Sequence, residues 1–166
     1  MSSIQILNSQ QIQYRLSRMA YEVYEGHFSE EEVFLAGVTR QGYALAQMMH
    51  RELSAIGPIH FRLAQLSFDK RNPIISEPEL DIPLETLHQK SIILVDDVIN
   101  TGQTLFYAAK PFCEILVNQL KVLVLVNRDH TKFPFQPDYT GLSLATTVQE
   151  HISVALTSEE QAVYLT

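Results

Sequence analysis

The chain has little that would cross-link it or place it in a membrane. It contains no tryptophan and a single cysteine, Cys113, which excludes an intrachain disulfide and a metal centre built on several thiolates. The apolar residues around Cys113 predict a small buried thiol. No apolar run approaches the roughly 20 residues that a membrane-spanning helix needs, and the first residues lack the basic flank and apolar stretch of a signal peptide. We therefore expect a cytoplasmic protein with no membrane partner.

Positive charge is also scarce. The chain has 12 Lys and Arg residues against 19 Asp and Glu residues, so its formal net charge is −7. This balance disfavours broad binding to nucleic acid or to an anionic membrane, which requires a positive field. It still allows a small phosphate site made of backbone N–H groups and one or two cations. With 46 % apolar and 19 % charged residues, the chain is expected to fold as one domain, residues 1–166.

The apolar pattern indicates an α/β protein with a parallel sheet. Helical spacing predicts helices at residues 9–28 (with Ser9 as N-cap), 43–56 and 103–117, and short apolar runs predict strands at 33–38, 59–68, 91–95, 120–126 and 151–156. In such sheets ligands bind beyond the carboxyl ends of the strands, where two polar turns fall, 39–42 and 96–102. Residues 69–90 contain Pro73, Pro78 and Pro83 but no clear period, and a connection of this length predicts a lid.

The most informative motif spans residues 92–104. A buried strand delivers Asp96 and Asp97, and a turn with two threonines and a glycine then leads into a helix. Free N–H groups at a helix start bind anions, and glycine lets a ligand approach the backbone. Paired carboxylates can accept hydrogen bonds from sugar hydroxyls or hold Mg²⁺ through water. Side by side, these groups predict a site for a phosphorylated sugar. The alternative is that Asp97 and the threonines only stabilise a helix start.

This run resembles the phosphoribosyl diphosphate motif of type I phosphoribosyltransferases: four apolar residues, two acids, a short variable stretch, Thr-Gly, one residue, then Ser or Thr. The resemblance implies that family's fold, a mostly parallel sheet flanked by helices, with a flexible lid loop at 69–90 and a small hood. It implies that Asp96 and Asp97 bind the ribose 2′- and 3′-hydroxyls and contact Mg²⁺ indirectly, through substrate or water. The remaining substrate-binding residues of the motif would be Val98, Ile99, Asn100, Thr101, Gly102, Gln103 and Thr104.

Residues 37–42 resemble the diphosphate loop of the same family. The resemblance places Thr39, Arg40, Gln41 and Gly42 at the diphosphate, and relatives often carry a non-proline cis bond at the position of the Thr39–Arg40 peptide. In the predicted lid, Lys70 and Arg71 match basic residues that close over this leaving group. Arg40 and Arg71 are thereby assigned to catalysis together with Asp96 and Asp97, and Lys70 to substrate binding. The alternative for each cation is a solvated surface charge.

The segments 124–134 and 137–141 resemble one subfamily, the bifunctional pyrimidine operon attenuator and uracil phosphoribosyltransferase. The likeness covers nearly the whole chain and implies that Asn127 and Arg128 lie near the base pocket. The subfamily's usual Asp at position 127 and Gly at position 129 are Asn and Asp here. Its RNA-binding face is basic, whereas this chain has no Lys or Arg at 141–156 and carries Gln136 and Leu142 where relatives often have Arg and Lys. RNA binding is therefore not expected.

Together these features predict a Mg²⁺-dependent enzyme that transfers 5-phosphoribose from phosphoribosyl diphosphate to a nucleobase and releases diphosphate and a nucleotide. Uracil is the first choice of base. A purine base is the alternative, although the neutral Asn100 stands where purine-type relatives often carry an aspartate. A non-catalytic, nucleotide-sensing regulator of pyrimidine synthesis is an alternative of a different class. By resemblance we expect a homodimer or a larger homo-oligomer.

Overall fold

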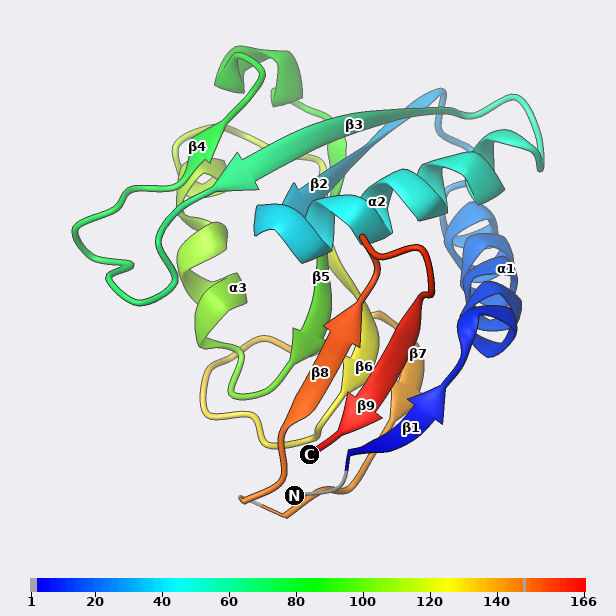
Figure 1. Ribbon diagram of the computed structural model, residues 1–166. Coiled ribbons are helices and arrows are strands. Elements are labelled where there is room, and N and C mark those ends of the chain that lie inside the picture. Colours follow the sequence, from blue (N-terminus) through cyan, green and yellow to red (C-terminus); the bar gives the residue numbers. More distant parts are fainter. Residues whose placement is uncertain (1–2, 148) are drawn as a thin grey trace.

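The computed structural model describes residues 3–147 and 149–166, which form two sheets and the helices around them (Figure 1). The larger sheet has six strands in the order β4-β3-β2-β5-β6-β7, and all of its neighbouring pairs are parallel except β3 with β4. The strands are β2 (Glu32–Val38), β3 (His60–Ser67), β4 (Glu79–Leu80), β5 (Ser91–Ile99), β6 (Gln119–Asn127) and β7 (Tyr139–Ser143). The predicted mostly parallel α/β sheet is confirmed.

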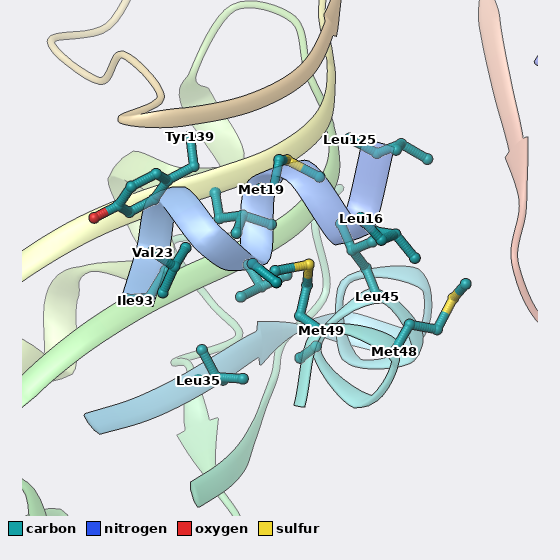
Figure 2. Packing of buried hydrophobic residues seen from close by; sticks show 14 of the residues in the cluster. Leu16, Met19, Val23, Leu35, Leu45, Met48, Met49, Ile93, Leu125 and Tyr139 are labelled. Carbon is teal, nitrogen blue, oxygen red and sulfur yellow. The ribbon is translucent and has the colours of Figure 1, made fainter. Parts of the chain in front are cut away.

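Helices cover both faces of this sheet, because its strands are apolar on both sides. Helices α1 (Ser9–Gly26) and α2 (Thr39–Ser54) lie on one face, where Leu16, Met19 and Leu45 pack against Ile93 and Leu125 of the strands (Figure 2). The short helix α3 (Gln103–Ala108) and the 3₁₀ turns η1 (Leu84–Leu87) and η2 (Lys110–Cys113) cover the other face. The sheet is thus buried between two layers.

The smaller sheet joins the two ends of the described chain. Strands β1 (Ile4–Leu7), β9 (Ala162–Leu165) and β8 (Ile152–Ala155) pair antiparallel in that order. Its residues Leu7, Ile152, Val154 and Val163 belong to the same core cluster as α1 and α2. This sheet is the predicted hood. The sequence indicated only β8 of its three strands, because β1 and β9 are four-residue strands without a long apolar run.

Several predicted boundaries were wrong. The N-cap of α1 is Asn8 rather than Ser9, because the Asn8 side chain accepts from the Gln11 N–H and the Gln11 side chain accepts from the Asn8 N–H, a capping box. The helix predicted at 103–117 ends at Ala108, shortly before Pro111, which has no backbone N–H and disfavours a helical residue before it. Cys113, at the end of η2, is exposed, so the prediction of a buried thiol was wrong.

The predicted lid region is only partly a loop. Its second half contains β4 and η1, Leu87 is fully buried, and the Gln65 N–H of β3 donates to the Asp81 carboxylate over 2.8 Å. The residues between β3 and β4 project from the edge of the sheet beside α3 (Figure 1). None of the helices in the described part of the chain combines the length and hydropathy that a transmembrane span requires.

Candidate active site

The two adjacent carboxylates lie where the strand order of the large sheet reverses. From β2 the chain continues outward to β3, and from β5 it continues the other way to β6, so β2 and β5 flank a topological switch point. Ligands of open α/β sheets bind at such points, beyond the carboxyl ends of the strands. β5 pairs with β2 only as far as Val95, and Asp96 is its first residue beyond that pairing. The first turn of α2 takes the place of β2 at this level.

The turn predicted at 96–102 is shorter than expected. β5 continues through Asp96 and Asp97 to Ile99, and its pairing with β6 continues in step to Asn127. Both acids are therefore held by a central strand rather than by a loop. Asp96 is 1 % exposed, whereas Asp97 is half-buried. The strand end predicted at Val95 was therefore wrong, because the sequence could not show how far β6 would extend the pairing of β5.

Asp96 is the most strongly perturbed acid of the site. Its Oδ1 accepts from the Asp97 N–H over 3.0 Å and lies 3.5 Å from Lys70 Nζ. Burial raises the pKa of Asp96 well above its usual range, the nearby charge of Asp97 raises it further, and Lys70 opposes both. Carboxylates whose pKa is raised by burial and that have a single charged partner are common in functional sites.

The turn from Asn100 to Thr104 forms a small cradle next to Asp96. Gly102 has φ +84°, in the left-handed region that favours glycine, and it precedes the first residue of α3. Thr101 Oγ1 accepts from the Gln103 N–H over 3.3 Å. The resulting hollow of about 70 Å³ is lined by Asp96 and by residues 98–105. It has the backbone amides and hydroxyls that a phosphate group needs, and the predicted motif residues Val98–Thr104 all line it.

The loop that follows β6 packs directly onto this cradle. The Arg128 N–H donates to Ile99 O over 3.1 Å, and the N–H groups of Lys132 and Phe133 donate to Thr101 O over 2.8 and 3.0 Å. Between the two segments lies a larger pocket of about 350 Å³, lined by Asn100, Thr101, Arg128, Asp129, His130, Thr131 and Lys132. Because it shares Asn100 and Thr101 with the cradle, a ligand can extend from one into the other.

Arg128 lines this pocket and also makes structural contacts that the sequence did not indicate. It is 5 % exposed, and its guanidinium donates to Thr146 Oγ1, Thr147 O and Glu150 O over 3.0, 3.1 and 2.6 Å. Arg128 thus connects the chain after β7 to the loop after β6 while lying at the pocket. Asn127 ends β6, and its Oδ1 accepts from the Asp129 N–H over 2.9 Å.

The turn predicted at 39–42 is wrong, because β2 passes straight into α2. Thr39 is the joint, with φ +56°, and the Thr39–Arg40 peptide is trans. A Cβ on Gly37 would lie 2.4 Å from Tyr43 Cα, and one on Gly42 would lie 2.5 Å from Val95 O and 3.3 Å from Asp96 Oδ1. The two glycines therefore allow the chain to turn directly from β2 into α2. They also allow the uncapped first turn of α2 to lie against Asp96.

The expected cations lie at different places around this turn. Arg40 is exposed, and its guanidinium contacts Thr157 Oγ1 at 3.5 Å; the neighbouring Gln41 Oε1 accepts from the Leu156 N–H over 3.4 Å. Lys70 reaches Asp96, whereas Arg71 is exposed and its own N–H donates to the Asp69 carboxylate. The contact of residues 156–157 with α2 was missed, because neither Leu156, which ends a predicted strand, nor Thr157 carries a local signal that it would meet α2.

The carboxylates suit an indirectly held Mg²⁺. Within residues 3–147 and 149–166 no group of three or more His, Cys, Asp and Glu side chains could enclose a metal ion. Mg²⁺ retains several waters and commonly takes one or two carboxylates together with substrate phosphates. Asp96 and Asp97 can supply that smaller share, and a phosphorylated ligand would supply the rest.

Known proteins share both the sequence and the fold. Residues 2–159 match the model of the phosphoribosyl transferase domain family. Bifunctional protein PyrR of Microcystis aeruginosa is 30 % identical over 164 residues, covering 92 % of this chain and 90 % of the relative. The PyrR protein of Haemophilus ducreyi is 26 % identical over 159 residues, covering 90 % and 87 %.

Solved structures extend the likeness to the tertiary level. A hypoxanthine-guanine phosphoribosyltransferase of Bacillus anthracis matches with a TM-score of 0.72 at 20 % identity, covering 87 % of this chain and 84 % of that one. The hypoxanthine phosphoribosyltransferase of Trypanosoma cruzi matches with a TM-score of 0.69 at 18 % identity, covering 84 % and 81 %. At these identities the likeness concerns the fold, and it confirms the fold class that the sequence indicated.

Proposed function

Because this chain belongs to the phosphoribosyl transferase domain family, we propose that it transfers the 5-phosphoribosyl group of phosphoribosyl diphosphate to a nucleobase and releases diphosphate. The observation that carries the proposal is the contiguity of the site. A phosphate cradle, two carboxylates, the uncapped start of α2 and a larger pocket adjoin one another at the switch point of the sheet. A donor with a 5′-phosphate, ribose hydroxyls and a diphosphate presents matching groups in the same order.

Each part of the donor has a partner of suitable chemistry. The amides and hydroxyls of residues 100–104 suit the 5′-phosphate, and the carboxylates of Asp96 and Asp97 suit the ribose hydroxyls. The first-turn amides of α2 suit the diphosphate, which also needs positive charge. Arg40 and Lys70 lie at that end of the site, and Arg71 follows Lys70 on the same exposed turn.

The reaction needs position and charge rather than a protein nucleophile. The base attacks C1′ while the bond from C1′ to the diphosphate oxygen breaks, so C1′ becomes oxocarbenium-like and negative charge grows on the leaving group. The cradle and the two acids hold the ribose in place for this attack, and Arg40 and the lid cations stabilise the departing diphosphate. Bound Mg²⁺ would add positive charge at the phosphate oxygens of the donor.

We propose uracil as the base. The curated relatives named PyrR, at 26 to 30 % identity, support a pyrimidine. The neutral Asn100 at the shared border of cradle and pocket supports it too, because this position offers an amide rather than a carboxylate to a purine N–H. The pocket has a volume of about 350 Å³ and is lined by polar residues, so its size does not exclude a purine. Purine bases are therefore included in the test.

The test is diphosphate release from phosphoribosyl diphosphate and Mg²⁺ with uracil, hypoxanthine, guanine or xanthine offered separately. Release with uracil alone supports the full proposal, and release with a purine alone would replace uracil by that base. No release with any base, together with tight nucleotide binding, would establish the non-catalytic regulator instead. The double variant Asp97→Asn with Thr104→Val should abolish donor binding in calorimetry; unchanged affinity would mean that the site lies elsewhere.

We further propose, from the resemblance, that the enzyme works as a homodimer or larger homo-oligomer. Sedimentation equilibrium of the purified protein measures this directly, and a monomer at micromolar concentration would contradict it.

A further inference from the structure

One ion pair connects the exposed segment between β3 and β4 to the centre of the site. Lys70 Nζ lies 3.5 Å from Asp96 Oδ1; the lysine side chain is 38 % exposed, whereas the aspartate side chain is 2 % exposed. Within the described residues this ion pair involves Asp96 and not its neighbour Asp97. A flexible surface cation has therefore reached a carboxylate that is otherwise shut off from solvent.

The surroundings of Asp96 leave little room for a second partner beside Lys70. The Asp97 N–H already donates to Oδ1, and the backbone of Gly42 is so close that a Cβ there would lie 3.3 Å from the same oxygen. In the proposed function the ribose hydroxyls donate to this carboxylate. They would have to approach a side chain that the lysine now covers.

Lys70 belongs to a small turn that is closed by its own hydrogen bonds. Asp69 organises it: its carboxylate accepts from the Arg71 N–H over 2.9 Å, and its own N–H donates to Ser76 Oγ over 2.9 Å. The Ser76 N–H donates to Asn72 O over 3.0 Å, which closes the turn at 69–76. The next residue, Glu77, pairs with Lys110 of η2. The turn is thus held at its far end by Glu77 and at the site by Lys70.

We propose that Lys70 and the ribose hydroxyls of the substrate compete for the Asp96 carboxylate, so that the donor displaces Lys70 from Asp96 with its hydroxyls and then binds it through its diphosphate. This inference rests on the proposed function of the site. The hydroxyls replace the ammonium at Asp96, and the displaced ammonium meets the diphosphate, whose charge exceeds that of one carboxylate. A nucleoside monophosphate also displaces Lys70 but offers it no diphosphate. The turn at 69–76 is then held by the contact of Lys70 with Asp96 in the empty enzyme. The monophosphate releases it, and the donor holds it again through the contact of Lys70 with the diphosphate.

The first experiment needs no ligand. Trypsin cleaves after Arg71, and the rate at the Arg71–Asn72 bond, followed by mass spectrometry, reports how often the turn opens. Removing the ion pair by Asp96→Asn should raise this rate about fivefold, since a single partly exposed pair is worth about 1 kcal/mol. Lys70→Met, a change in an exposed turn that leaves the core intact, should raise it equally. The matched control Asp97→Asn removes the neighbouring carboxylate and should leave the rate unchanged.

The second experiment adds ligands to the unaltered protein. Uridine 5′-monophosphate should raise the cleavage rate at Arg71, and phosphoribosyl diphosphate with Mg²⁺ should lower it below that of the empty protein. The opposite signs are the signature of competition, because a turn that merely packs nearby would respond to both ligands in the same direction. In Lys70→Met the monophosphate should no longer raise the rate.

The outcomes separate this inference from the proposed function. Equal rates for the wild type, Asp96→Asn and Lys70→Met would overturn the inference whatever the protein binds. Faster cleavage in both variants with protection by both ligands would overturn the competition while leaving the site in place. If neither ligand bound, the proposed function would fail first and the inference, which rests on it, would fall with it.

Discussion

Asp96 combines an unfavourable environment with a central place in the site. Burial and the charge of Asp97 raise the pKa of Asp96, and Lys70 compensates through one contact of 3.5 Å. A group whose pKa is higher in the folded than in the unfolded protein binds its proton more tightly when folded. Stability therefore falls as pH rises from the unfolded value of about 4 toward the raised folded value. In the proposed function this charge serves to bind the ligand, and a loss of stability is a common consequence of such a role.

This reasoning gives a prediction at the scale of one residue. Asp96→Asn, which cannot ionise, should be more stable than the wild type at pH 7 by about 0.5–2 kcal/mol, while donor binding is lost. The advantage should shrink as pH falls and vanish below about pH 4, where both proteins carry an uncharged group. Urea denaturation of both proteins between pH 3 and pH 8 measures it. An Asn variant that is less stable at pH 7 would show that the charge stabilises the fold.

Asp129 is one of three non-glycine residues with positive φ in the described part of the chain. Its φ is +59°, in the region that favours glycine, and its N–H is held by Asn127 Oδ1. The subfamily that the sequence resembles usually carries glycine at this position, and the backbone explains why. The aspartate is tolerated because short polar side chains reach the left-handed region at lower cost than others.

We therefore expect Asp129→Gly to raise the free energy of unfolding by about 0.5–1 kcal/mol, since the relief of the left-handed backbone exceeds the entropy that glycine adds to the unfolded chain. The matched control is Thr131→Gly, in the same exposed loop but without positive φ. This change should lower the free energy of unfolding. Thermal unfolding of the two variants tests the sign; a loss of stability in Asp129→Gly would contradict the explanation.

At the scale of the element, the junction of β2 with α2 decides how the site is built. The first turn of α2 approaches β5 so closely that a Cβ on Gly42 would meet Val95 O at 2.5 Å. No side chain caps the start of α2, so its first N–H groups lie at the switch point without a capping hydrogen bond. Gly42 is needed because it lets α2 approach β5 closely, and not because it makes the chain flexible.

Replacing Gly42 by alanine should therefore lower the stability of the protein, although the same change raises it in most helices. Gly to Ala in a helix ordinarily stabilises by about 1 kcal/mol, but Gly42→Ala should destabilise by more than about 2 kcal/mol, because α2 must move away from β5. Gln47→Gly, at an exposed position of the same helix, is the control and should lose only about 0.5–1 kcal/mol. Chemical denaturation measures both. A stabilised Gly42→Ala would mean that α2 and β5 can separate without loss.

At the scale of the molecule, the scarcity of positive charge separates two kinds of ligand. The net charge is −7, and the segment 141–156 has neither Lys nor Arg. Lys70 and Arg40 lie instead at the edge of the site. A small phosphorylated sugar can be held by a few local cations and backbone amides, whereas RNA needs a row of cations across a surface.

RNA of a pyrimidine-operon leader should consequently show no specific shift in a gel assay at about 0.15 M salt, where weak electrostatic binding is screened. The same protein preparation should bind the donor in calorimetry, which controls for folding. A specific RNA band at this salt would show that the chain has an RNA-binding surface that its charge does not reveal.

The sequence by itself determined the layered α/β architecture and the principal site motif. Unbroken apolar runs such as 92–95 can only be buried between two layers, and the order of residues 96–104 places acids, glycine and hydroxyls at one strand end whatever surrounds them. Local chemistry and chain order sufficed for these. The hood was expected only from the family resemblance, and of its three strands the sequence pattern indicated β8 alone.

Only the tertiary structure decided which side chains meet. Lys70 and Asp96 are 26 positions apart, Arg40 and Thr157 are 117 apart, and no periodicity links them. The same holds for Arg128, whose hydrogen bonds to Thr146, Thr147 and Glu150 connect two loops that are distant in the sequence. Such pairings depend on how strands, turns and the hood pack in space. The sequence therefore determines the chemistry available to the site, and packing determines where each charge is used.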